Sequence, residues 1–98
     1  MAYHIETWDE PSKLHIRTEI RAQHLAYVQD QAHLVLAAGA KLNDDGSTAG
    51  GGVYIVDVDT REEAERFIAG DPFHSAGLFQ EVRVQRWRKA FFDGRCLL

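Results

Sequence analysis

The chain has 98 residues, of which 45% are hydrophobic and 27% are charged, and its formal net charge is −4. This length and composition predict one small soluble globular domain, and the single cysteine excludes an intramolecular disulfide framework. The negative net charge argues against a nucleic-acid-binding module, because such modules need a basic surface. No apolar run is long enough to cross a bilayer, and the N-terminus lacks the pattern of a signal peptide. We therefore expect a cytoplasmic protein with no membrane or nucleic-acid partner.

The first half of the chain predicts a strand, a helix and a second strand. Residues 3–8 alternate with a period of two, which is typical of a β-strand. Residues 14–32 contain no glycine or proline, and apolar residues spaced by three and four predict one buried helical stripe. A joint near Arg21 is compatible with this pattern, although the spacing does not place it. Residues 34–40 fit either a buried strand or a helix end, and their shortness favours a strand.

The second half begins with a predicted loop over residues 43–52 and a clear strand over residues 53–58. Thr60 then stands three positions before Glu63, which is a capping-box pattern, and predicts a helix that ends at Gly70. The sequence Asp71-Pro72-Phe73 predicts one more helical turn. A last strand includes Val82 and Val84 and runs toward Phe91, and residues 93–98 form a tail without clear pattern, either loose or docked on a partner.

The order strand, helix, strand, strand, helix, strand predicts an α+β fold of the ferredoxin-like, split βαβ type. We expect a single domain over residues 1–98, with an antiparallel sheet that carries both helices on one face. If Tyr54, Val56 and Val58 face the helices, Val53 and Ile55 must point to the uncovered face. An apolar uncovered face is typical of an interface, so we expect a homodimer.

Metal and phosphate sites are not expected. The five histidines lack the close pairs that zinc sites use, and no Cys-x-x-Cys accompanies them. The run Gly50–Gly52 precedes a strand instead of opening a helix, which favours a hairpin connection over a phosphate loop.

The first helix carries the most informative polar residues. Arg17, Arg21 and His24 lie at intervals of four and three, so a continuous helix places them on one face. An imidazole oriented by a carboxylate is an effective general base, whereas a lone helical histidine beside arginines is commonly part of a solvated face. Asp71 before a proline is equally explained as a helix N-cap, and spacing does not bring Asp71 to His24.

Several short motifs, in order, resemble the YCII-like (YciI-related) family from Tyr3 to about Phe91. The most specific are Arg21-Ala22-Gln23-His24-Leu25 and Gly70-Asp71-Pro72-Phe73, with weaker support from Ala37-Ala38-Gly39 and from residues 76–91. The resemblance implies a ferredoxin-like fold that pairs into dimers of the dimeric α+β barrel type. It also implies a His–Asp dyad at His24 and Asp71, with Pro72 stiffening the turn that presents the aspartate. Two departures are Ala22, where the family often has proline, and the loop over residues 43–52.

The function implied by this resemblance is cofactor-independent acid–base chemistry on a small aromatic or cyclic carbonyl compound. The best-defined activity of the family is elimination of HCl from a chlorinated hydroxyhydroquinone, and relatives of the same fold include muconolactone isomerases. In such a reaction His24 is the base, Arg17 or Arg21 supplies a donor to the developing negative charge, and Asp9 holds one arginine. Ser75 is a weaker supporting candidate. The alternatives are a non-catalytic small-ligand-binding or accessory module, and a domain that serves only dimerisation.

Overall fold

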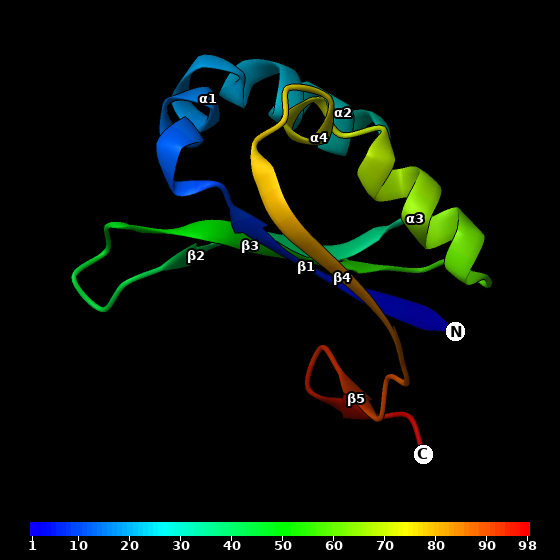
Figure 1. Cartoon of the computed structure of the whole chain (residues 1–98). Helices are drawn as coiled ribbons and strands as arrows, with labels where there is room; N and C mark the ends of the chain where they lie inside the picture. Colours follow the sequence, from blue (N-terminus) through cyan, green and yellow to red (C-terminus); the bar gives the residue numbers. More distant parts are fainter.

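Four strands form one sheet, and the helices lie together on one of its faces (Figure 1). The structure is a computed structural model that describes residues 1–98. Its elements follow in the order β1 (Ala2–Asp9), a single 3-10 turn (Pro11–Lys13), α1 (Leu14–Glu19), α2 (Arg21–Asp30), β2 (Val35–Leu42), β3 (Thr48–Val56), α3 (Arg61–Ala69), α4 (Pro72–Ser75), β4 (Phe79–Trp87), β5 (Phe91–Phe92) and β6 (Arg95–Cys96). None of the helices is long and apolar enough to cross a membrane.

The sheet has the strand order β2-β3-β1-β4, and every neighbouring pair is antiparallel. This order, with the helices on one face, is the ferredoxin-like α+β arrangement, so the fold predicted from the sequence is confirmed. In the register, Ile5 of β1 lies opposite Tyr54 of β3 and Val84 of β4, so these three side chains share one face.

The hydrophobic core lies between this face and α3. Ile5 and Val56 are completely buried at the centre of the sheet, and Ala64 and Phe67 cover them from α3. Burial of each large apolar side chain stabilises the fold by about 1.5–3 kcal/mol. Thr60 caps α3 as predicted, since its Oγ1 accepts a hydrogen bond of 3.1 Å from the backbone N–H of Glu63.

The opposite face of the sheet is uncovered. Val53 and Ile55 alternate with the buried core residues of β3 and therefore point to this face, as their spacing predicted. Together with neighbouring small residues of β2 they line a shallow hollow of about 230 Å³. On the same face, Trp8 is flanked by the ammonium of Lys41, 4.0 Å from its ring centroid, and the guanidinium of Arg83, 5.2 Å away.

The glycine-rich segment before Val53 was predicted as loop, and this prediction is wrong for residues 48–52. Strand β3 begins at Thr48, so that only residues 43–47 connect it to β2. Gly52 is needed in the strand, because a Cβ there would lie 2.9 Å from the carbonyl oxygen of Gly39. Close approach of two backbones explains a glycine in a strand, where the residue is otherwise unfavourable. The apolar segment over residues 34–40 is mostly strand, as favoured.

The last strand was predicted to run toward Phe91, and this is also wrong. Strand β4 ends at Trp87, and Phe91–Phe92 pair with Arg95–Cys96 in a separate hairpin. Its turn has positive φ at Asp93 (53°) and Gly94 (73°), which is the geometry that tight hairpins favour. The hairpin lies on the side of the sheet opposite the helices (Figure 1).

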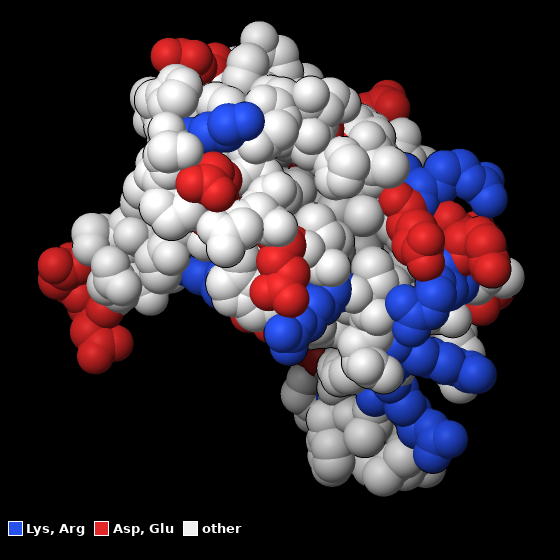
Figure 2. Space-filling view, in the orientation of Figure 1, with Lys and Arg blue, Asp and Glu red and all other residues white.

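Charge is distributed unevenly along the chain. The segment over residues 83–95 contains one acidic residue, Asp93, and five basic ones, Arg83, Arg86, Arg88, Lys89 and Arg95, although the whole chain has a net charge of −4. Figure 2 shows basic side chains over the end of β4 and the C-terminal hairpin, and acidic side chains at the far tip of the β2–β3 connection. The end of β4 and the hairpin are therefore mainly basic, whereas the tip of the β2–β3 connection is acidic.

Candidate functional site

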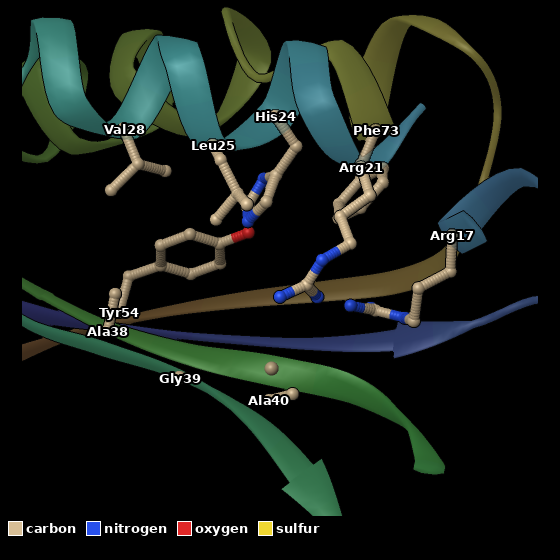
Figure 3. Close-up of a pocket in the computed structure, with 11 residues that line it drawn as sticks. Arg17, Arg21, His24, Leu25, Val28, Ala38, Gly39, Ala40, Tyr54 and Phe73 are labelled. Carbon is tan, nitrogen blue, oxygen red and sulfur yellow. The ribbon is translucent and has the colours of Figure 1, made fainter. Parts of the chain in front are cut away.

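A pocket of about 280 Å³ lies between α2 and the strands β2 and β3 (Figure 3). Its polar lining consists of Arg17, Arg21, His24 and Tyr54. The remaining lining is apolar or backbone and consists of Leu25, Val28, Ala38, Gly39, Ala40, Gly52 and Phe73. A small concave site with a few convergent polar groups on an apolar wall is typical of ligand-binding pockets.

The predicted row of polar residues on the first helix is brought together despite a joint. The helical segment is divided at Ile20, which lies between Glu19, the last residue of α1, and Arg21, the first residue of α2. Hydrogen bonds continue across the joint, since Ile20 N–H donates to Ile16 (2.8 Å) and His24 N–H donates to the carbonyl of Ile20 (3.0 Å). Arg17, Arg21 and His24 consequently still face one pocket.

His24 and Asp71 are in direct contact, although 47 residues separate them in the chain. The ring atom Nδ1 of His24 lies 2.8 Å from Oδ2 and 3.0 Å from Oδ1 of Asp71. An ionised carboxylate has no hydrogen to donate, so Nδ1 is the donor, and in the neutral imidazole Nε2 then keeps its lone pair. The carboxylate thereby fixes the tautomer that leaves Nε2 as a proton acceptor.

Asp71 is completely buried, and its carboxylate is held by two further donors. Oδ2 accepts a hydrogen bond of 2.9 Å from the hydroxyl of Tyr54, and Oδ1 accepts one of 2.9 Å from the backbone N–H of Phe73. The second bond makes Asp71 the N-cap of α4, as one of the two predictions for this residue required. Asp71 is thus both a helix cap and the partner of His24.

Two aromatic rings fix the imidazole. The ring of Phe73 stacks on His24 with centroids 4.2 Å apart and planes at 15°, and the ring of Tyr54 meets it edge-on at 6.2 Å. Burial and the charge of Asp71 raise the pKa of the Tyr54 hydroxyl well above its ordinary value of 10.0. Tyr54 is therefore a stable hydrogen-bond donor to Asp71 throughout the physiological range of pH.

Arg17 is anchored by Asp9, as proposed from the sequence. The guanidinium makes two parallel hydrogen bonds to the carboxylate, from Nε (2.7 Å) and from a terminal nitrogen (2.9 Å). The Asp9 carboxylate is fully buried, and Cζ of Arg17 also lies 4.9 Å from the centroid of the Phe73 ring. This bidentate geometry fixes the orientation of the guanidinium at one end of the pocket.

Two predicted supporting residues do not line the pocket. Ser75 is exposed on α4, and no hydrogen bond joins its side chain to the site. Pro72 is the first residue of α4, where its fixed φ suits the helix start, and it is not among the residues that line the pocket.

Two residues of the site were not assigned to it from the sequence. Tyr54 was predicted to face the helices, and Phe73 was part of a motif, but neither was connected with His24. A tyrosine at a core position needs a partner for its hydroxyl, and this need was the available signal. No group of three or more histidine, cysteine, aspartate and glutamate side chains is arranged to hold a metal ion.

Comparison with known proteins gives a consistent relationship. The sequence matches the model of the YCII-related domain over residues 1–88. Protein YciI of Escherichia coli O6:H1 (strain CFT073) is 30% identical over 98 aligned positions. The alignment covers 93% of this chain and 100% of that protein. An uncharacterized protein of Haemophilus influenzae (strain Rd) is 33% identical with the same coverage.

A solved structure is similar over most of its length. It is 5-chloro-2-hydroxyhydroquinone dehydrochlorinase (TftG) from Burkholderia phenoliruptrix AC1100, in complex with 2,5-dihydroxybenzoquinone. The TM-score is 0.81 and the identity 31%, over 90% of this chain and 94% of that chain. The family match, the two relatives and this structure agree with the resemblance drawn from the motifs at His24 and Asp71. This chain belongs to the YCII-related family.

Proposed function

We propose that this protein is a small-molecule lyase or isomerase in which His24 is the general base. The observation that carries the proposal is the 2.8 Å contact between a buried Asp71 carboxylate and Nδ1 of His24, which lines a ligand-sized pocket. Such a pair holds one tautomer of the imidazole and stabilises the imidazolium that forms when a proton is accepted. The similarity to a dehydrochlorinase that binds a dihydroxybenzoquinone supports a small cyclic substrate.

The proposed chemistry begins with proton transfer to Nε2 of His24 from a hydroxyl or an acidic carbon of the substrate. When the proton leaves a hydroxyl, the bonding pair stays on that oxygen. When it leaves a carbon beside a carbonyl, the pair forms a C=C bond and the C=O pair moves to the carbonyl oxygen, so negative charge develops on a substrate oxygen in both cases. The guanidinium groups of Arg17 and Arg21 face the pocket and can donate hydrogen bonds to that oxygen. In a lyase, the oxygen pair returns to form a C=O bond, the ring electrons form a new C=C bond to a tetrahedral ring carbon, and chloride or another leaving group departs from that carbon with its bonding pair. In an isomerase, the proton returns to another carbon of the same substrate. Neither route requires a cofactor.

The experiment is turnover of candidate substrates by the purified protein and matched variants. Chloride release from a chlorinated hydroxyhydroquinone tests the lyase, and proton exchange into a lactone in deuterated water tests the isomerase. His24→Gln should reduce turnover by about 10²–10⁴-fold, and Asp71→Asn should also reduce turnover. His33→Gln is the control, because His33 is exposed and does not line the pocket.

The alternative is a binding module that uses the same pocket without catalysis. It predicts that these compounds bind to the wild-type protein, that binding depends on the pocket residues, and that no product forms. Equal turnover by the wild type and by His24→Gln would overturn the proposal of a His24 base. A dimerisation domain without ligand predicts neither binding nor turnover.

We also propose that the uncovered face of the sheet joins two copies of the chain. Val53 and Ile55 present an apolar surface there, beside the hollow lined by β2. The hairpin on the same side exposes Phe91 (66%) and Leu98 (83%), which a second copy would shield from water. Because a two-fold axis can bring opposite ends of two copies together, the basic hairpin of one copy is then near the acidic β2–β3 tip of the other.

A further inference from the structure

The pocket is chemically divided along its length. In Figure 3 the side chains of Arg17 and Arg21 lie at one end with their guanidinium groups close together. Leu25 and Val28 lie toward the other end, and His24 stands between the two groups. A ligand that fills the pocket therefore contacts cationic groups at one end and aliphatic groups at the other, with its middle beside the imidazole.

The charge of Arg17 is already compensated within the chain. Its guanidinium is bound to Asp9 by two hydrogen bonds of 2.7 and 2.9 Å, and the carboxylate is buried. Its position above the ring of Phe73 restrains it further. Since a buried bidentate pair loses much when it is opened, Arg17 stays with Asp9 when a ligand enters.

Arg21 is more exposed than Arg17, and its charge has no such partner within the chain. No side chain forms an ion pair or a hydrogen bond with it, although it lines the same pocket. The neighbouring carboxylate of Asp71 is occupied by His24, Tyr54 and the N–H of Phe73. An uncompensated guanidinium at a concave surface is suited to a planar anion, which it can bind through two parallel hydrogen bonds.

No acidic side chain in the first turn of α2 balances the charge of Arg21. Arg21 is the first residue of this ten-residue helix, the N-cap Ile20 offers no side-chain acceptor, and the first turn contains no acidic residue. This local excess of positive charge is notable in a chain whose net charge is −4.

From these contacts we infer that the ligand of this pocket is anionic before any reaction takes place. It carries a carboxylate or phenolate that binds Arg21, on a small ring whose apolar part lies against Leu25 and Val28. The inference rests on the proposed function, because it takes the pocket at His24 as the substrate site, and it narrows the substrate class to small cyclic anions. Arg21 is then the residue that selects for charge, and Arg17 shapes the same end of the pocket.

The test measures binding of charged and neutral ring compounds by titration calorimetry at neutral pH. Benzoate and benzamide form a matched pair that differs in charge. para-Nitrophenol, measured above and below its own pKa, compares binding of the phenolate with binding of the neutral phenol. Wild-type protein should bind the anionic forms at least about tenfold more tightly than the neutral forms, and added salt should reduce the difference. Preference for benzoate alone or nitrophenolate alone identifies which anion the site takes.

The variants separate the two arginines. Arg21→Gln should lower the affinity for the preferred anion by about tenfold or more and leave that for benzamide nearly unchanged, and Arg21→Lys should restore part of the loss. Arg66→Gln is the matched control, because Arg66 is an exposed arginine on α3 that does not line this pocket. Loss of anion binding in Arg66→Gln would mean that general surface charge is responsible, which overturns the inference.

Other outcomes are equally decisive. Equal binding of benzoate and benzamide, absence of binding by every anion, or full anion affinity in Arg21→Gln each overturns the inference. Failure of the proposed function looks different: His24→Gln then leaves turnover unchanged, whereas the charge preference set by Arg21 persists. If the inference and the proposed function both hold, His24→Gln keeps the preference for the anionic over the neutral compound and loses turnover.

Discussion

The hydroxyl of Tyr54 donates a hydrogen bond of 2.9 Å to Oδ2 of Asp71, the same oxygen that lies 2.8 Å from Nδ1 of His24. The sheet, through β3, thereby holds the carboxylate from one side, and α2 contacts it from the other. Because the carboxylate is fully buried, each donor also offsets part of the desolvation that burial of its charge entails. The link between sheet and helix is thus made through the candidate catalytic group itself.

Replacement of Tyr54 by phenylalanine tests this link through stability at alkaline pH. Below pH 10.0 the Tyr54 phenol is protonated in both folded and unfolded chains, so it adds no pH dependence. Above that value the unfolded chain releases the proton, whereas burial and the charge of Asp71 keep it in the folded chain. The free energy of unfolding of the wild type should therefore fall by up to about 1.4 kcal/mol per pH unit on this account.

In Tyr54→Phe this contribution to the alkaline slope should disappear, and stability at neutral pH should fall by about 0.5–1.5 kcal/mol because one buried hydrogen bond is lost. Urea unfolding at a series of pH values measures both quantities. Tyr3→Phe is the matched control for removal of a buried phenol, since Tyr3 is similarly buried but does not contact Asp71. An alkaline slope that is unchanged in Tyr54→Phe would refute this account.

Removal of the Asp71 carboxylate should destabilise the fold more than loss of any single donor. Asp71→Ala leaves the Tyr54 hydroxyl, the Phe73 N–H and the His24 Nδ1–H without their acceptor, and should lower the free energy of unfolding by about 3–5 kcal/mol. Asp71→Asn keeps one oxygen and should have a smaller effect. The measurement is urea unfolding at neutral pH.

Asp57→Ala provides the comparison, because Asp57 is exposed and its replacement should change stability by less than about 0.5 kcal/mol. Equal losses in Asp57→Ala and Asp71→Ala would contradict a special role of the buried carboxylate. A folded Asp71→Asn variant also allows the catalytic role to be tested separately from the structural one.

Local patterns predicted much of this fold because their causes are local. The strand at Tyr3 and Ile5, the capped helix after Thr60 and the turn after Asp71 all rest on neighbouring residues. The C-terminal hairpin also had a local signal, the Asp93-Gly94 pair, which is typical of tight turns. The prediction did not use that signal, because it treated residues 93–98 as a tail without clear pattern.

The site depends on long-range contacts, which the spacing of residues along the sequence does not predict. His24 and Asp71 are 47 residues apart, and the motifs carried by the family resemblance suggested their association. The start of β3 could not be predicted from propensity, because glycines weaken a strand unless another backbone lies as close as Gly39 does to Gly52. Tyr54 remained unassigned because its partner is fixed only when the helices have packed on the sheet.

The Asp9–Arg17 pair should show strong energetic coupling. Asp9→Asn removes the charge that a mostly buried guanidinium faces, and should lower the free energy of unfolding by about 1–3 kcal/mol. In a double-mutant cycle with Arg17→Met, the coupling energy should exceed about 1 kcal/mol. The exposed pair Glu81–Arg83, with a 3.0 Å contact, is the control and should couple by about 0–1 kcal/mol. Similar coupling in the two cycles would show that burial adds nothing at Asp9.

A charge on the uncovered face of the sheet should prevent the proposed self-association. Ile55→Lys places an ammonium among Val53 and the small residues of β2, so burying this face against a second copy would strand an unpaired charge. We expect the wild type to sediment with twice the mass of the chain. The dimer of the variant should dissociate at protein concentrations at least about tenfold higher than those at which the wild-type dimer dissociates. Ala26→Lys, on the exposed surface of α2, adds the same charge elsewhere and should leave the dimer intact.

A monomeric wild type, or equal dissociation in both variants, would show that this face does not join two copies. Because Ile55 points away from the helices, its replacement leaves the core residues Tyr54 and Val56 in place, and a folded monomer remains available for measuring turnover.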